Sequence, residues 1–321
     1  MSGTAITVSH KTTNRSTEQQ ANRRGFFDQE NILSRLSFLT RILLNYRSDK
    51  DCPYCASPDT QLKQRKLYLL ELRTCTFCGL MYRWPKSTPD FAERYYQSRY
   101  KESSLTTEVP AQAQLDRLLA ANFSGSPKDF SRPIALLKEF LPTGRVLDFG
   151  ASWGYGTYQL KQAGYDAFGF EISRPRAAYG REHLDVQILD CLDDLRHIPS
   201  HSIDAIFANH VLEHLLSLRE PFALFARILK PGGVALIAVP NAGGELARSL
   251  GTRWRTLINE KHTLALDARF FERNLTAYGF NVRTFADPYT VADLRHAIEK
   301  NLPLSADQGQ ELIILATCQP S

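Results

Sequence analysis

Four of the six cysteines of this 321-residue chain lie in two close pairs. Two residues separate Cys52 from Cys55, two separate Cys75 from Cys78, and nineteen lie between the pairs. Two Cys-x-x-Cys turns supply a closed tetrahedral shell of thiolates that suits Zn²⁺ and leaves no position for water. We therefore expect a structural zinc ribbon. Two disulfides or four free thiols are the alternatives, and disulfides fit poorly with a sequence that shows no export signal.

A second candidate site is the sequence VLDFGASWGYG over residues 146–156, in which an apolar run and an acid precede the glycines. The spacing Gly150-x-x-x-Gly154-x-Gly156 matches neither the dinucleotide fingerprint nor the phosphate-cradling loop, which needs a lysine that is missing here. Asp148 precedes the glycines on the ligand side and would repel a pyrophosphate. The loop thus favours a ligand that carries an amine or another cationic group.

The elements that position this loop follow from residue 144 onward. The expected strands cover residues 145–150, 167–173, 186–190, 203–209, 234–240, 281–287 and 311–318. The expected helices cover residues 156–164, 174–183, 221–229 and 268–279, the last capped by Asp267. Strands that alternate with helices predict an α/β fold with a doubly wound, seven-stranded and mostly parallel sheet. Ligands bind beyond the carboxyl ends of such strands, where the glycine loop lies.

The acid and glycine loop resemble motif I of the class I S-adenosylmethionine-dependent methyltransferases, whose fold is Rossmann-like. Glu171, Asp190 and the segments SIDAIFANHVLEHL (202–215) and ARILKPGGVALIAVPN (226–241) resemble that family in the same order. The resemblance covers about residues 130–320. It implies S-adenosylmethionine as the cofactor. The residues that it implies in cofactor binding are Asp148, Gly150, Ala151, Gly154, Gly156, Glu171, Ile172, Asp190, Cys191 and Asn209.

The resemblance also implies individual roles. The glycines would let the backbone approach the methionine part and the ribose of the cofactor. Glu171 would hold the ribose, since a carboxylate suits a vicinal diol. Asp148 would order the loop or meet the amine through water, and Asp190 would lie near the adenine. Loop capping is the alternative for Asp148 and Glu171. Trp153 and Tyr155 either cover the cofactor or pack the first helix.

Methyl transfer to an oxygen needs an aligned acceptor and a group that removes its proton. Three histidines are candidates for that base, because histidine titrates near neutral pH. His262, in a long insert after the fifth strand, is favoured over His210, which is favoured over His214. The quinone-pathway O-methyltransferases, which this segment resembles, can bind a metal through Glu-x-x-Glu-His. Here His210 occupies the first position, so we expect no metal in this place.

The resemblance implies a small-molecule acceptor, methylated on oxygen, in glycan, nucleotide-sugar or secondary-metabolite biosynthesis. An RNA methyltransferase in which the ribbon grips RNA is the alternative, and a non-catalytic scaffold is a third. The chain lacks the Asn/Asp-Pro-Pro-aromatic turn of enzymes that methylate base amines, having ANHV there. Its net charge is +5, of which +4 falls in residues 1–50, so a broad nucleic-acid footprint is not indicated although nucleic acid stays open as a partner.

The expected organisation has four parts. These are a disordered tail with an amphipathic helix near 28–46 (residues 1–47), the zinc ribbon (48–86), a helical linker or lid (87–130) and the methyltransferase domain (131–321). In the third part Pro89 indicates a helix start. Tyr95, Tyr96 and Tyr100 would pack that helix. No apolar run is long enough to cross a membrane, and we expect a cytoplasmic protein. The sequence does not indicate an oligomeric state.

Overall fold

The computed structural model describes residues 38–94, 97, 108–300 and 304–319. By its internal contacts the chain divides into two units, Met1–Arg47 and Ser48–Ser321. In the first unit residues 38–44 are helical, and the rest of the helix expected over 28–46 lies outside the described residues. None of the helices in the described ranges combines the length and the apolar content that a membrane crossing needs.

The larger sheet of the second unit has seven strands in the order β10-β11-β8-β7-β4-β5-β6. Its strands are β4 (Arg145–Phe149), β5 (Asp166–Phe170), β6 (Ile188–Leu189), β7 (Ile203–Asn209), β8 (Leu229–Pro240), β10 (Phe280–Ala286) and β11 (Glu311–Cys318). The pairs from β6 to β8 are parallel, whereas β11 runs antiparallel to both β8 and β10. The predicted seven-stranded, mostly parallel sheet is confirmed.

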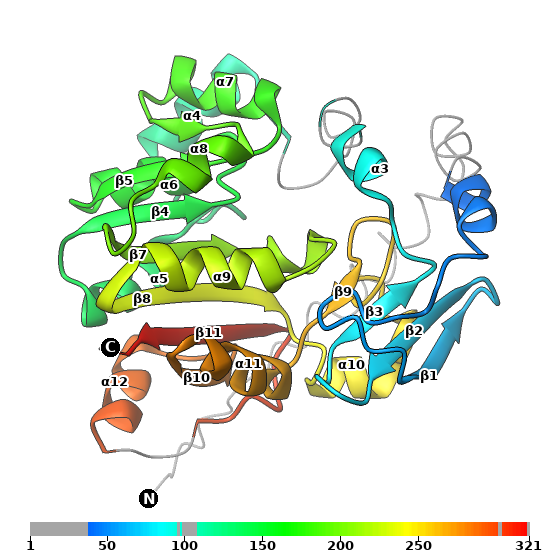
Figure 1. The fold of residues 1–321 in the computed structure, drawn as a ribbon. Coiled ribbons are helices and arrows are strands. Elements are labelled where there is room, and N and C mark those ends of the chain that lie inside the picture. The colour runs from blue at the N-terminus through cyan, green and yellow to red at the C-terminus, as the bar shows by residue number, and fades with distance from the viewer. Residues whose placement is uncertain (1–37, 95–96, 98–107, 301–303, 320–321) are drawn as a thin grey trace, which may run out of the picture. The chain divides into compact units, whose positions relative to one another are not determined.

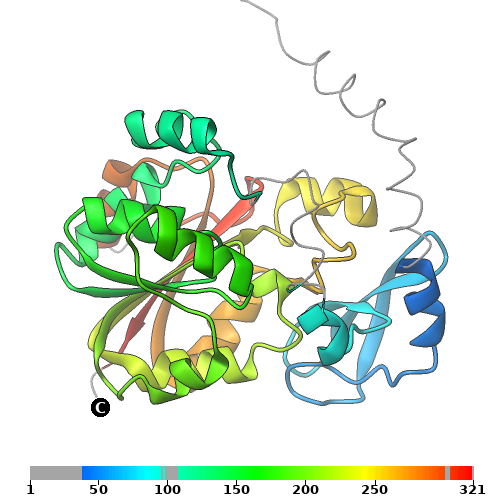
Figure 2. The same ribbon diagram turned by 90° about the horizontal axis from the view of Figure 1, so that it is seen from above.

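Helices cover both faces of this sheet (Figures 1 and 2). Successive side chains of a strand point to opposite faces, so Leu147 and Ile206 lie in one core while Val146 and Phe207 lie in the other. The first core also takes side chains from α8 (Leu192–His197), α9 (Arg219–Ile228) and α11 (Ala268–Leu275). The second takes them from α5 (Ser131–Phe140), α6 (Tyr155–Gln162) and α12 (Val291–Glu299). The sheet is therefore doubly wound.

The remaining helical elements are shorter or lie at the sheet's rim. They are α3 (Pro89–Arg94), α4 (Gln112–Ala120), α7 (Arg174–His183) and α10 (Glu245–Leu250), with 3-10 turns η2 (Leu212–His214), η3 (Gly251–Arg253) and η4 (Thr276–Tyr278). Two of these elements lie near the candidate histidines: η2 contains His214 and follows His210, and His262 lies in the segment after η3.

The four cysteines belong to a smaller antiparallel sheet of order β1-β2-β3-β9. Its strands are β1 (Thr60–Lys66), β2 (Leu70–Cys75), β3 (Met81–Trp84) and β9 (Leu264–Ala265). The strand β9 comes from the insert after β8 and lies beside β3, as Figure 1 shows. The ring of Tyr54 packs against Phe222 and Phe270 at centroid distances of 6.0 and 5.4 Å. The cysteine-bearing sheet therefore shares its core with one face of the large sheet.

Several expected boundaries are wrong. The apolar sequence KLYLLELRTC over residues 66–75 predicts one strand that leads into the second cysteine pair, but Leu67 and Tyr68 have positive φ and form the turn between β1 and β2. Such turns usually carry Gly or Asn, so a Leu-Tyr pair gives no signal in the sequence. The helix expected over 268–279 ends at Leu275 and continues as η4, while its predicted cap is right, since Asp267 accepts from the Phe270 N–H. The tyrosines at 95, 96 and 100 lie outside the described residues.

Candidate functional site

The glycine loop joins β4 to α6 at the carboxyl end of the large sheet. Gly150 and Gly154 have φ of +87° and +83°, a conformation that side chains with a Cβ disfavour. The Gly150 and Ala151 N–H groups both donate to the carbonyl of Phe170 at the end of β5. A Cβ on Gly150 would lie 2.3 Å from Val211 Cγ2. The loop therefore packs directly on the turn after β7 that carries two of the histidines.

Two buried acids hold this loop in place. Asp148 Oδ2 accepts from Thr157 Oγ1 at 2.7 Å, and burial raises the pKa of Asp148 to about 7. Glu171 accepts from the Ser152 N–H (2.9 Å) with Oε2 and from the Ser173 N–H (2.7 Å) with Oε1. Burial raises the pKa of Glu171 as well. Each Glu171 oxygen keeps a second lone pair, so this carboxylate can hold the loop and also accept from a diol.

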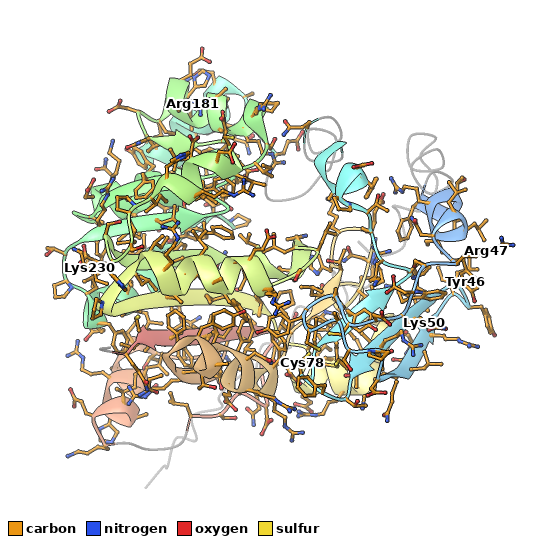
Figure 3. All side chains as sticks on the ribbon, viewed as in Figure 1. Tyr46, Arg47, Lys50, Cys78, Arg181 and Lys230 are labelled. Atoms are coloured by element: carbon orange, nitrogen blue, oxygen red, sulfur yellow. The ribbon has the colours of Figure 1, made fainter. Side chains whose placement is uncertain are left out.

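Asp190 and Cys191 follow β6 on the same edge of the sheet. The Asp190 carboxylate forms an ion pair with Arg181 of α7 at 2.9 Å, and Cys191 is exposed. Figure 3 labels Arg181, which lies on α7 on the same side of the picture as β4 and β5. The ion pair offsets the charge of Asp190 but leaves carboxylate lone pairs for a hydrogen-bond donor.

The other residues predicted around the cofactor lie along the same edge. Ala151 is buried within the loop, and a Cβ on Gly156 would come 2.9 Å from Asp148 Oδ2. The Ile172 carbonyl accepts from Gln97 Nε2 at 2.8 Å. Asn209 ends β7 and is half-buried. Because β7, β4, β5 and β6 are neighbours in that order, the edge brings the predicted set to consecutive strand ends.

The loop's tryptophan is part of the core. Trp153 is fully buried, with its ring 5.0 Å from that of Tyr155 and 6.1 Å from that of Phe123. Tyr179 of α7 meets the same indole edge-on at 6.0 Å. Of the two interpretations of Trp153, packing is therefore the one that the structure supports.

His210 follows β7 in a left-handed conformation, with φ of +54°. Its Nδ1 lies 3.2 Å from Glu213 Oε1 and its Nε2 lies 2.7 Å from Glu311 Oε1. A ring with a carboxylate at each nitrogen donates from both, which requires an imidazolium. Burial lowers the pKa of His210, but the hydrogen bonds to the two glutamates outweigh it and raise that pKa to about 10. The imidazole side chain is 42% exposed, so its desolvation is incomplete and the two carboxylates determine the direction of the pKa shift.

His214 and His262 face each other beside Glu213. Their rings are perpendicular, with centroids 4.7 Å apart. His214 Nδ1 donates to the Lys261 carbonyl at 3.3 Å, and His262 Nδ1 donates to the Thr256 carbonyl at 2.5 Å. Burial lowers the pKa of both rings, that of His262 to about 4. Both imidazoles are therefore neutral near pH 7, with the lone pair on Nε2.

The four cysteine thiols converge at the other candidate site. Their sulfur atoms all lie within 4.8 Å of one another, and the Cys52–Cys78 and Cys55–Cys75 pairs are 3.5 Å apart. All four are free, because a disulfide needs about 2.05 Å. Tetrahedral Zn–S bonds of about 2.3 Å place the sulfurs about 3.8 Å apart, so the set fits Zn²⁺. Figure 3 shows Cys78 where this sheet meets α11, and its carbonyl accepts from Asn274 Nδ2 at 3.0 Å.

The family model described as "Methyltransferase domain" matches residues 111–284, which is more than half of the chain. The chain belongs to this family. It is a class I S-adenosylmethionine-dependent methyltransferase, and the residues at the glycine loop fit that cofactor: left-handed glycines for close approach, and a buried carboxylate with spare acceptors for a diol.

Curated relatives of this methyltransferase match its central part. A probable S-adenosylmethionine-dependent methyltransferase of Mycolicibacterium smegmatis is 28% identical over 144 residues, 43% of this chain and 52% of the relative. The malonyl-[acyl-carrier protein] O-methyltransferase of Yersinia pestis is 26% identical over 121 residues, 36% of this chain and 43% of the relative. This chain thus spans about half or less of the length of these relatives.

Among solved structures, phosphoethanolamine N-methyltransferase 2 of Haemonchus contortus in complex with S-adenosyl-L-methionine superposes with a TM-score of 0.48. The identity is 18%, and the match covers 75% of this chain and 62% of that chain.

Sequence reasoning missed three charged residues of the methyltransferase site. Arg176 is buried and donates to Ser152 Oγ at 3.0 Å, beside Glu171. Glu311 begins β11, and only the placement of β11 against β8 brings it to His210. Lys261 precedes His262, and burial lowers the pKa of its amine to about 8. For Arg176 the sequence offered one indication, the run Arg-Pro-Arg shortly after Glu171, since an arginine near a carboxylate often pairs with it.

Proposed function

We propose that this methyltransferase transfers a methyl group to an oxygen of a small-molecule acceptor. The observation that carries the proposal is the group formed by buried Glu213 and half-buried His214 and His262, which adjoins the cofactor loop through Val211. A protein that only bound the cofactor would have no use for two neutral imidazoles and an acid in that place. One matched relative is named an O-methyltransferase, which agrees with an oxygen acceptor.

The glycine loop and its acids would bind the cofactor. Glu171 accepts from the ribose hydroxyls with the lone pairs that Ser152 and Ser173 leave over, and Asp148 keeps the loop on the first turn of α6. When bound, S-adenosylmethionine supplies a methyl group on a positively charged sulfur, which becomes a neutral thioether as the acceptor oxygen takes the methyl.

His262 is the favoured base. Its Nδ1–H is fixed on the Thr256 carbonyl, so Nε2 carries the lone pair and can take the proton of an acceptor hydroxyl. As the O–C bond forms and the S–C bond breaks, that proton stays on Nε2. His214 has the same tautomer but lies against Glu213. His210 already carries both protons and is unsuited to accept another.

We also propose the division of the chain into a tail and helix, a structural zinc ribbon over 48–86, a linker or lid over 87–130 and the catalytic domain from 131. The thiol geometry supports the ribbon. A four-thiolate shell has no open position, so zinc would stabilise the fold without touching the acceptor.

The cofactor assignment is tested by calorimetry with S-adenosylhomocysteine. Glu171→Ala should weaken binding at least about tenfold, since it removes a charge-assisted acceptor worth about 1.5–3 kcal/mol. Glu182→Ala, on the exposed side of α7, is the matched control and should bind like the wild type. Equal binding by Glu171→Ala and the wild type would contradict the assignment.

The acceptor class is tested by transfer of labelled methyl groups to pooled hydroxylated metabolites and nucleotide sugars, with His262→Ala as the inactive variant. Retention on RNA that weakens steeply with salt, with labelled RNA as product, would instead favour the RNA-directed alternative.

A further inference from the structure

Glu213, His214 and His262 form a compact group of metal-ligating side chains. Glu213 and His214 lie on η2, and His262 comes from the insert after β8. One ligand atom from each of the three lies within 4.8 Å of the others. The side chain of Glu213 is 2% exposed, yet its Oε2 has no hydrogen-bond partner among the described residues. A buried carboxylate oxygen without a partner is costly, so its presence points to an absent ligand.

The hydrogen bonds of the two imidazoles support this interpretation. Each ring donates its Nδ1–H to a backbone carbonyl, of Lys261 for His214 and of Thr256 for His262. Both rings therefore keep the Nε2 lone pair, and His214 Nε2 lies 3.9 Å from Glu213 Oε1. Metal-bound histidines are oriented in this way by a second, outer hydrogen bond. Electron pairs from two nitrogens and a carboxylate thus converge, which favours a cation between them.

His210 is a neighbour of this group but cannot belong to it. Both of its nitrogens face carboxylates, which leaves no lone pair for a metal. Its imidazolium instead holds Glu213 Oε1, whereas Oε2 has no hydrogen-bond partner among the described residues.

We propose that Glu213, His214 and His262 bind a divalent first-row transition ion such as Zn²⁺, Mn²⁺ or Fe²⁺. Two imidazoles and one carboxylate suit these ions better than Mg²⁺ or Ca²⁺, which prefer oxygen ligands throughout. Ligands about 2.1 Å from a tetrahedral ion are about 3.4 Å apart, so ligand atoms that lie within 4.8 Å of one another need to contract by no more than about 1.4 Å.

Three protein ligands leave at least one coordination position open. An acceptor oxygen could occupy it, and the ion rather than His262 Nε2 would then activate that oxygen, because Nε2 is a ligand. This role rests on the proposed function, whereas the binding site itself does not. The Glu-x-x-Glu-His motif alone would place His210 with Glu213 and His214 as the third ligand. In the structure the insert after β8 supplies His262 as the third ligand instead.

The test is metal content. Full-length protein is stripped with a chelator, re-equilibrated with excess Zn²⁺, freed of unbound metal by gel filtration and analysed by mass spectrometry. The wild type should retain about two equivalents of zinc per chain, one in the ribbon and one here. Glu213→Gln and His262→Ala should each retain about one, and Cys75→Ser should lose the other one. His296→Ala, an exposed histidine of α12, should match the wild type.

Two results would overturn the proposal: one equivalent in the wild type that Cys75→Ser removes, or two equivalents in both Glu213→Gln and His262→Ala. Circular dichroism verifies that the variants are folded, and Glu213→Gln preserves the side-chain shape if His262→Ala is unstable. Binding of S-adenosylhomocysteine is measured on the same samples. Cofactor binding without a second zinc refutes this site alone, whereas no cofactor binding refutes the proposed function whatever the zinc count.

Discussion

The contact between the glycine loop and the turn after β7 makes a quantitative prediction for Gly150→Ala. Gly150 has φ of +87°, and a Cβ there would lie 2.3 Å from one methyl of Val211 and 2.8 Å from the other. The left-handed backbone costs an alanine about 1–2 kcal/mol. Forcing a methyl into packed atoms typically costs about 1–3 kcal/mol more. We therefore expect Gly150→Ala to lower the free energy of unfolding by about 2–5 kcal/mol.

A glycine elsewhere in the chain separates the two contributions. Gly279 has nearly the same backbone conformation, with φ of +83°, but a Cβ there would meet nothing within 4 Å. Gly279→Ala should therefore lose only the backbone part, about 1–2 kcal/mol. Val211→Ala removes the colliding methyl groups, so in that background Gly150→Ala should also cost only about 1–2 kcal/mol. The expected coupling in the double-mutant cycle is the difference, about 1–3 kcal/mol.

The assay is urea denaturation of the four Gly150 and Val211 proteins and of Gly279→Ala, followed by calorimetry with S-adenosylhomocysteine. Gly150→Ala should bind the cofactor product more weakly than Gly279→Ala, because only the first displaces the loop. Equal losses of stability in the two alanine variants, or an additive cycle, would refute direct packing between the loop and Val211.

Two further predictions concern buried charge and the ribbon. The pKa of Asp148 is about 7 in the folded protein against about 3.9 unfolded, so its contribution to stability is full below pH 3.9 and is lost as pH rises through 7. An amide does not titrate, so the free energy of unfolding of Asp148→Asn minus that of the wild type should rise by up to about 4 kcal/mol between pH 4 and pH 8. If the two free energies of unfolding instead change in parallel with pH, Asp148 does not have the raised pKa of a buried acid. Cys75→Ser should lose the zinc of the ribbon and have a lower melting temperature than the wild type, whereas Cys191→Ser, at an exposed thiol, should change neither. If the wild type is as stable without zinc as with it, the zinc is not structural.

Local patterns identified the cofactor edge of the methyltransferase because its residues are near one another in sequence. Asp148, the glycines and Glu171 each sit at a strand end, and the alternation of strands and helices is enough to place those ends side by side. The cysteine pairs were equally readable, since thiol spacing defines the turn that brings them together.

The acceptor side was less predictable, because its contacts cross the fold. Glu311 contacts His210 only because β11 pairs with β8, and the sequence around residue 311 does not predict that pairing. His262 meets His214 through a strand of two residues, too short for a periodic pattern. The charge of each histidine could not be predicted from the sequence either, because residues distant in the sequence determine which of the imidazoles is protonated.

The pairing of β3 with β9 has a consequence for how the chain is made. Tyr82 pairs with Leu264 and Met81 with Ala265, so the last strand of the cysteine-bearing sheet is synthesised after most of the large sheet. Until then a nascent chain that has already folded both cysteine turns presents an open strand edge, flanked by the apolar side chains of Tyr82 and Trp84. Since the segment that closes this edge follows closely on His262, the pairing that completes the cysteine-bearing sheet also brings His262 to His214.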